Sequence, residues 1–373
     1  MIRTSFLGSM VVPIVVLMSA LFGSSVAAET FTYGSGVPER SSASYKGIYP
    51  MLDKITAATQ KRVEFKRLMG GVVVQIPTGL QGVRDGIVDS GFTIMQAHPA
   101  NLPVASLVAD LGGLGTDTYA TMGAINEFMF LHCPGCMADF RKQGVVPLLT
   151  QSATPLTMAC TKPAATAADL KGLRAVALGA PELRWAARLG MTPARTTFAE
   201  VLQQLQLGNA DCFVAPISWI KSYGLQDVVK SVIEMPQGVV SGALPLFFSQ
   251  KSWSRISEAD RLTILRLMPE ANFHYVHDAY VEFDEAAKKE YQSKIRFVPG
   301  DKAMAEAWAQ YQAAEPVALI DLMERRNVPN AKALVDDAVA VFRRWHVEHA
   351  PKIRTPEGFA EVMWREVYSK IKP

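Results

Sequence analysis

Residues 168–219 read ADLKGLRAVALGAPELRWAARLGMTPARTTFAEVLQQLQLGNADCFVAPISW, and this stretch indicates the fold. Two short apolar runs, Leu173–Leu178 and Cys212–Ala215, have the length of strands. Between them, Pro181 suits the first turn of a helix and Gly190 suits its end. A second helical pattern follows. The order strand, helix, helix, strand, with tight turns, predicts an α/β domain with right-handed crossovers.

The second helical pattern has its own start and stop signals. Thr197 and Glu200 have the spacing of a capping box, and Gly208 is placed to end the helix. The apolar residues that would share one face of this helix are Phe198, Val201, Leu202 and Leu205.

The combined pattern resembles the dicarboxylate-binding type of solute-binding protein that serves tripartite ATP-independent periplasmic (TRAP) transporters. Asp169–Leu173 matches the D-L-K-G-hydrophobic run of that family, and Leu189–Pro193 matches its hydrophobic-G-hydrophobic-x-P step. Phe198–Glu200 and Gly208–Asp211 match the helix that follows, with Pro216 after it. The resemblance implies a two-lobed α/β fold. Its sheets would be mixed and flanked by helices, and a long kinked helix would span both lobes.

The same resemblance predicts how the chain is divided between the lobes. A helical pattern from Ser257 to Ile295 contains Pro269, where a kink is expected, although two separate helices broken there remain an alternative. The expected segments are 29–153 in lobe I, 154–242 in lobe II, 243–268 returning to lobe I, and 269–373 as the spanning helix and C-terminal helices, mainly in lobe II.

The N-terminus has the pattern of a cleaved secretory signal. An apolar run, Val11–Phe22, follows a basic residue and precedes the small-residue site Val26–Ala28. The signal peptide would therefore be residues 1–28, with Glu29 starting a periplasmic protein of about 345 residues. A membrane anchor is the alternative, but the run is short and contains Pro13.

Composition and motifs exclude several functions. The net charge is +3 with both signs interspersed, and no basic run is interleaved with aromatic residues, so nucleic acid is not an expected partner. The chain has no G-x-S-x-G, H-E-x-x-H, P-loop or G-x-G-x-x-G motif. The missing motifs are weak evidence by themselves, but together with the signal peptide and the family-like stretch they lead us to expect a binding protein rather than an enzyme, with no cofactor.

The four cysteines allow three pairings. Cys133 and Cys136 are separated by two residues and form the natural pair, which leaves Cys160 and Cys212, each in an apolar strand candidate. In an oxidising compartment these would be structural disulfides. A redox pair at Cys133-Pro-Gly-Cys136 is the alternative, although its flanks do not resemble a thioredoxin site.

Zinc is a further alternative for the cysteines, and the histidines do not favour it. Most histidines are expected on solvated or packed helix faces, and no metal site is expected. The isolated histidines are His98 and His132, and the i,i+3 pairs are His274/His277 and His346/His349.

The positions that resemble the family's ligand site depart from its pattern. The family's carboxylate-binding arginine corresponds to Val176, its asparagine before the proline to Ala215, and, by a looser match, a second arginine to Leu156. Either the ligand is more apolar or neutral, or another arginine holds its carboxylate, or the protein serves as a sensor or adaptor. Arg184, Arg40 and Arg84 are the arginine candidates.

We therefore expect a periplasmic protein that captures a small organic acid, with a substantial apolar part, and delivers it to the membrane subunits of a TRAP transporter. A secreted thiol-disulfide oxidoreductase and a ligand-binding sensor are the alternatives. Arg184 is the first candidate for a replacement carboxylate clamp. The expected ligand-binding residues are Ser35, Arg40, Thr93, Gln96, Leu156, Val176, Arg184, Ala215, Trp219 and Phe247.

Overall fold

A computed structural model describes Met1 and residues 28–372. The expected signal peptide falls almost entirely on residues 2–27, outside the described part of the chain. Among the helices of the described residues, none is both long and apolar enough to cross a membrane.

The first of two sheets builds lobe I and has the strand order β2-β1-β3-β10-β4. Strand β1 pairs in parallel with β2 and β3, while β10 runs antiparallel to β3 and β4. All seven residues of β10 are buried, as its continuous apolar run predicts for an interior strand. The strands are β1 (Glu29–Gly34), β2 (Val63–Leu68), β3 (Ser90–Ile94), β4 (Val145–Pro147) and β10 (Ala243–Ser249).

The second sheet builds lobe II and has the order β11-β9-β5-β8-β6-β7. Strand β6 pairs in parallel with both β7 and β8, so the carboxyl ends of these three strands meet at one edge. The strands are β5 (Thr157–Cys160), β6 (Arg174–Ala177), β7 (Thr192–Arg195), β8 (Cys212–Ala215), β9 (Ser231–Ile233) and β11 (Arg296–Val298).

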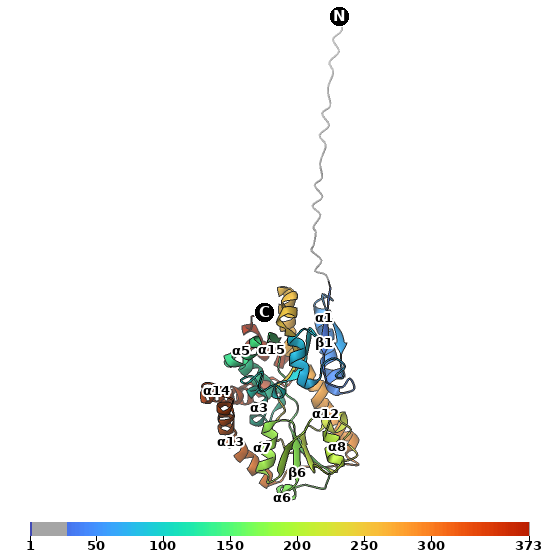
Figure 1. The fold of residues 1–373 in the computed structure, drawn as a ribbon, viewed down its shortest axis with the longest axis vertical. Coiled ribbons are helices and arrows are strands. Elements are labelled where there is room, and N and C mark those ends of the chain that lie inside the picture. Colours follow the sequence, from blue (N-terminus) through green and yellow to red (C-terminus); the bar gives the residue numbers. More distant parts are fainter. Residues whose placement is uncertain (2–27, 373) are drawn as a thin grey trace.

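Helices flank both sheets, and in Figure 1 the blue elements of lobe I lie above the green elements of lobe II. The mixed, two-lobed α/β fold is therefore confirmed. The α-helices from the lobe I segments are α1 (Tyr49–Ala58), α2 (Gly79–Arg84), α3 (Leu107–Asp110), α4 (Thr118–Glu127), α5 (Pro134–Lys142) and α10 (Gln250–Arg255). Those from the lobe II segment are α6 (Ala167–Leu170), α7 (Ala180–Arg188), α8 (Val201–Gln206) and α9 (Ser218–Ser222).

Two chain segments connect the sheets and run side by side. The chain leaves lobe I after β4 and returns between β9 and β10. Isolated antiparallel bridges join Gln151 to Ala243 and Pro155 to Val239 within these connections. The expected lobe boundaries, 153/154 and 242/243, fall in the same two connections.

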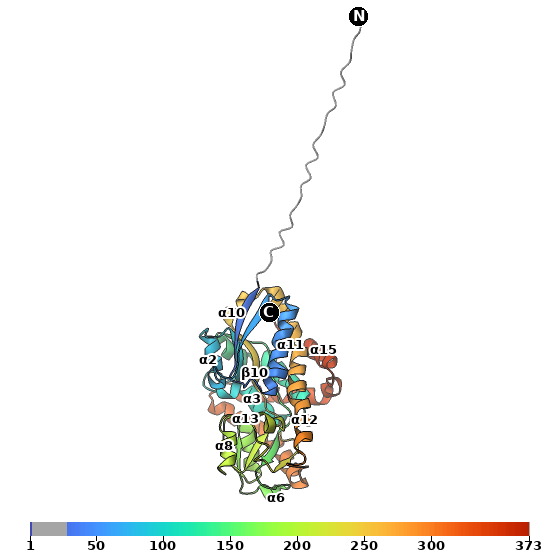
Figure 2. The same cartoon turned by 90° about the vertical axis from the view of Figure 1, so that its right-hand side faces the viewer.

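A third connection is the long helix that the sequence predicts. It comprises α11 (Glu258–Val276), a π-helical turn η6 (His277–Val281) and α12 (Glu282–Tyr291), which follow one another without a break. Pro269 lies inside α11 and does not end it, so the alternative of two helices broken there is wrong. Helix α11 packs on α1 and α12 packs on α9, and Figure 2 shows the two along one side of the molecule. The change of lobe therefore occurs near η6, beyond Pro269.

The C-terminal helices lie differently from the expectation that they would pack mainly on lobe II. Helices α14 (Ala331–Arg344) and α15 (Pro356–Glu366) pack on α4 of lobe I, and α15 also packs on α11. The close fit has a local cause, since Gly123 of α4 leaves room for the buried ring of Trp345. Helix α13 (Lys302–Arg325) instead bridges the lobes, because it contacts α7 of lobe II and α3 of lobe I.

The stretch 168–219 contains one strand more than its pattern predicts. Strand β7, with the sequence Thr-Pro-Ala-Arg, is exposed along its length and forms the edge of the second sheet, where a proline is tolerated. The order is therefore strand, helix, strand, helix, strand. Helix α8 also begins later than expected, at Val201, and the Thr197 hydroxyl donates to the Glu200 carboxylate instead of closing a capping box.

Both expected disulfides are confirmed. Cys160 and Cys212 lie directly opposite each other on the antiparallel strands β5 and β8, with their Cα atoms 4.0 Å apart. The bond between Cys133 and Cys136 closes the first turn of α5. All four cysteines are fully buried.

Candidate functional site

A cavity of about 590 Å³ lies between the lobes, within the size range of small-molecule sites. It is found where parallel strands of both sheets end, which is the usual place for ligands in open α/β sheets. Its lining from lobe I and the connections is Gly36, Val37, Pro38, Ala43, Gln75, Ile76, Pro77, Phe92, Ile94, Gln96, Ala97, Gln151, Ala153, Val240 and Ala243. Its lining from lobe II and η6 is Leu178, Arg195, Thr196, Thr197, Phe198, Ala199, Trp219, Tyr223 and Tyr280.

Three aromatic side chains form one wall, which we call the aromatic wall: Phe198, Trp219 and Tyr223. The ring of Phe198 stacks on Tyr223 with centroids 4.8 Å apart and meets Trp219 edge-on at 4.9 Å. Phe213 of β8 stacks behind Trp219 at 5.9 Å. Because these rings hold one another, the wall presents a rigid apolar surface to the cavity.

A buried carboxylate holds the start of α9, the helix that carries Trp219. Asp284 of α12 accepts a hydrogen bond from the backbone N–H of Ser218 at the start of α9 (2.5 Å). Burial raises the pKa of Asp284 from its ordinary value to about 6. This contact ties the aromatic wall to the long helix.

Arg195 is the last residue of β7 and the charged residue among the described lining residues of the cavity. Its backbone is held in the sheet, in register with Ala177, and the next residue donates its N–H to the Ala177 carbonyl (3.1 Å). One nitrogen of its guanidinium donates to the Leu178 carbonyl (3.2 Å). Among the described residues Arg195 forms no ion pair, although its charge acts on the buried Glu182.

Four of the expected ligand-binding residues lie at or just behind the cavity. Gln96 and Trp219 line it. Ser35 is buried and its Oγ accepts from the Val37 N–H (3.1 Å), so it shapes a loop of the wall. Thr93 is buried and its hydroxyl donates to the Ile76 carbonyl (2.9 Å), beneath the same wall.

Four others are buried in the packing and are not among the lining residues: Leu156, Val176, Ala215 and Phe247. Val176 and Ala215 sit inside the second sheet, and Phe247 sits inside the first. The apolar character of these positions therefore contributes to the core, and the apolar surface of the cavity comes from other residues.

Arg184, the first candidate for a carboxylate clamp, is engaged elsewhere. Its guanidinium binds both carboxylate oxygens of Glu315 on α13, with Nε to Oε2 at 3.1 Å. The Glu315 side chain is 1% exposed. Arg326, the residue directly after α13, forms an ion pair with buried Asp110 of α3, with one guanidinium nitrogen 2.9 Å from the carboxylate. We call these four residues the α13 ion-pair cluster.

The other two arginine candidates also lie outside the lining of the cavity. Arg40 is exposed. Arg84 pairs with the neighbouring Asp85 (2.8 Å) and donates to the Gln143 side chain (3.2 Å). The sequence signal for Arg195 was weak, because it is a single charged residue in a stretch without strand periodicity.

The charge of Glu182 on α7 is coupled to Arg195 of the cavity and to Arg184 and Asp110 of the α13 ion-pair cluster. Its carboxyl is fully buried, and Oε2 has no hydrogen-bond partner among the described residues. Burial, helped by the charge of Asp110 and opposed by Arg184 and Arg195, raises the pKa of Glu182 from the ordinary 4.5 to about 7. The Glu182 carboxyl therefore changes between its protonated and ionised forms near neutral pH.

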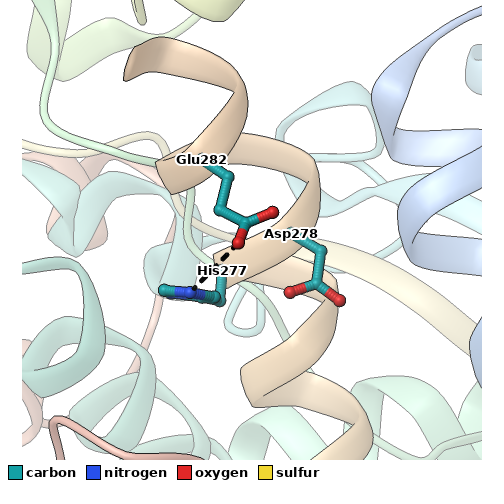
Figure 3. A group of neighbouring side chains, drawn as sticks. All are labelled: His277, Asp278 and Glu282. Atoms are coloured by element: carbon teal, nitrogen blue, oxygen red, sulfur yellow. Dashed lines mark ion pairs between the residues drawn. The ribbon is translucent and has the colours of Figure 1, made fainter. Parts of the chain in front are cut away.

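A polar cluster on the π turn has metal-ligand residue types, and Figure 3 shows its three side chains. The π turn brings His277 and Glu282, five positions apart, within 3.8 Å. The acidic members already have partners, however. Lys46 lies 3.6 Å from Glu282, and His274 lies 3.4 Å from Asp278. These ion pairs account for the polar cluster as a network that stabilises the π turn.

Comparison with known proteins identifies the protein family to which the chain is similar. The model of the bacterial extracellular solute-binding proteins, family 7, matches residues 34–315. No curated protein matches the sequence directly.

Solved structures show the same fold at low sequence identity. A TRAP periplasmic solute-binding protein from Bordetella bronchiseptica, with bound (R)- and (S)-mandelate, has a TM-score of 0.71 and 22% identity over 85% of this chain and 99% of its own. A TRAP solute-binding protein from Rhodoferax ferrireducens, with copurified benzoate, has a TM-score of 0.74 and 18% identity over 85% and 98%. An extracytoplasmic solute receptor from Bordetella pertussis that binds pyroglutamic acid has a TM-score of 0.69 and 19% identity over 85% and 100%.

The two lobes, the cavity between the ends of their strands and the long spanning helix agree with a family match that covers most of the chain. This chain belongs to family 7 of the bacterial extracellular solute-binding proteins.

Proposed function

We propose that this protein is a periplasmic receptor that captures a small organic acid with a large apolar part and delivers it to a TRAP-type membrane transporter. The observation that carries the proposal is the cavity itself. It combines an aromatic wall with one cationic side chain, Arg195. Such a lining matches a molecule that has an apolar body and one acidic group.

The similar structures support the acidic part of the proposal. Their described ligands are mandelate, benzoate and pyroglutamic acid, which are small monocarboxylic acids with a ring. The fold they share with this chain places the cavity between two lobes, and the family match extends over both.

Capture would work by closure of the lobes. A ligand in this cavity contacts both walls, so it stabilises the closed arrangement more than the open one. The parts that must flex are the connections at Thr154–Leu156 and Val240–Leu244, together with the long helix near η6, where it passes from one lobe to the other. Small-angle scattering should show a smaller radius of gyration with ligand, and an unchanged profile at saturation would contradict closure.

The direct test is native mass spectrometry of protein purified from a periplasmic preparation, followed by calorimetry with benzoate, (R)-mandelate, pyroglutamate and succinate. We expect a retained or added organic acid at one site per chain. The absence of binding by every acid, together with no retained ligand, would overturn the proposal.

The alternative of a thiol oxidoreductase receives no support from the cysteine geometry. Cys133 and Cys136 are bonded and fully buried, so the disulfide presents no accessible sulfur to a substrate. A sensor role differs from transport in its partner. Genes for the two membrane subunits of a TRAP transporter beside this one would favour transport.

A further inference from the structure

The proposed function leaves open which side chain holds the acid, and the following inference rests on it. We infer that Arg195 of β7 binds the ligand carboxylate, and that the cleft accepts a single carboxylate joined to a flat apolar body.

The charge of the cavity lining favours Arg195 as the carboxylate-binding residue. Arg195 is the charged residue among the described lining, and the remaining polar residues are neutral. A carboxylate moved from water into an apolar site without a cationic partner or several donors is strongly disfavoured. Arg195 is therefore the group of this lining that can neutralise the charge of a bound carboxylate.

The guanidinium of Arg195 is also available to a ligand. It has five N–H donors, and among the described residues it uses one of them, towards the Leu178 carbonyl (3.2 Å). The sheet fixes its backbone beside Ala177 while its side chain stays exposed at the edge of the cleft. An anchored backbone with free, forked donors suits two parallel hydrogen bonds to a carboxylate.

Arg184, by contrast with Arg195, is already held in an ion pair. Both oxygens of Glu315 already bind the Arg184 guanidinium, and Glu315 is buried. Turning Arg184 towards a ligand would leave a carboxylate buried without its partner, which is a large penalty. Arg195 can bind a ligand without breaking an ion pair.

The single charge also limits the ligand. A second carboxylate would face the lobe I wall, which is apolar except for neutral groups such as the amides of Gln75 and Gln96. The aromatic wall on the other side suits a planar ring. The cleft is therefore expected to prefer an aryl monocarboxylate over a compact dicarboxylate.

The experiment is calorimetric titration of the full mature chain with benzoate and with benzamide, its neutral analogue. Arg195→Ala should weaken benzoate binding by roughly 10- to 150-fold and leave benzamide binding unchanged. Arg195→Lys should fall between the two, because it keeps the charge and loses the fork. Arg188→Ala, an exposed arginine of the same lobe outside the cavity, is the matched control. Thermal unfolding checks that each variant is folded.

The outcomes separate this inference from the proposed function. Binding of benzoate, mandelate or pyroglutamate that is indifferent to Arg195→Ala would overturn the assignment of Arg195 while the proposed function stands. Tighter binding of succinate than of benzoate would overturn the single-carboxylate preference alone. Failure of the wild type to bind any acid would overturn the proposed function and this inference with it.

Discussion

The α13 ion-pair cluster and the cleft lie close together, and each contains an arginine from the same β-α-β unit of lobe II. Arg184 of α7 is paired with a buried glutamate, whereas Arg195 of β7 faces the cavity with most of its donors free. Two arginines eleven positions apart thus differ in their partners, a buried carboxylate for one and a single backbone carbonyl for the other. The comparison shows that the partner of a guanidinium determines whether the arginine stabilises the fold or is available to a ligand. Its position near a family motif does not determine this.

The largest expected effect comes from breaking the ion-pair cluster. Arg184→Ala leaves the Glu315 carboxylate buried and uncompensated, which should lower the free energy of unfolding by roughly 3–5 kcal/mol. The loss should shrink towards pH 5, because burial raises the pKa of Glu315 and an unpaired Glu315 takes up a proton more readily. Urea denaturation at two pH values measures this.

For the same variant, affinity for benzoate should stay within about two-fold of wild type, a change under roughly 0.5 kcal/mol. Arg84→Ala, which removes an exposed ion pair, is the control and should leave stability unchanged within error. A variant of Arg184 that folds normally but loses affinity would assign Arg184 to the cleft after all.

The second effect concerns Glu182, whose charge is coupled to both regions. Burial raises its folded pKa to about 7, so between about pH 4.5 and 7 the folded protein holds a proton that the unfolded chain has released. The free energy of unfolding should therefore fall as pH rises through this window. Glu182→Gln stays neutral and should be more stable than wild type at pH 8 by roughly 3 kcal/mol.

At pH 4 the stabilities of Glu182→Gln and wild type should converge, because the wild-type carboxyl is then protonated in both states. Denaturation curves from pH 4 to 8 test this. A difference in the free energy of unfolding that stays constant from pH 4 to 8 would show that the Glu182 carboxyl does not titrate in this range.

A smaller effect is expected from the aromatic wall. Phe198→Ala removes the ring that stacks on Tyr223 and should weaken benzoate binding by about 1 kcal/mol, or roughly five-fold. Benzamide should lose the same factor, since the ring contact does not depend on charge. A loss confined to benzoate would mean that Phe198 acts by positioning Arg195.

The smallest effect is the response to salt. Arg195 is exposed, so its attraction for a carboxylate should be screened, and benzoate affinity should fall a few-fold between low salt and 0.5 M sodium chloride. Benzamide affinity should stay constant. Equal salt responses of the two probes would indicate that charge does not contribute to binding.

Local patterns determined much of the fold. The apolar runs that became β6, β8 and β10 were long enough to identify as strands, and Ser257 was identified as the start of the long helix. Its hydroxyl accepts the Asp260 N–H (3.1 Å), as a capping residue should. The disulfides also followed from spacing and from strand position. Each of these features depends on residues that are close in sequence or on a regular repeat.

Only the tertiary structure decided the composition of the site. Strand β7 has no apolar alternation and exists because β6 offers it a parallel edge, so Arg195 could not be placed at the cleft from its neighbours in sequence. Arg184 was equally ambiguous, since its partner Glu315 lies 131 residues away. The sequence by itself determined most strands and helices, because periodicity and capping are local, and the resemblance to a family implied that they form two lobes. Which arginine is free to bind was decided by contacts between distant segments, because a charged side chain has no periodicity that records its partner.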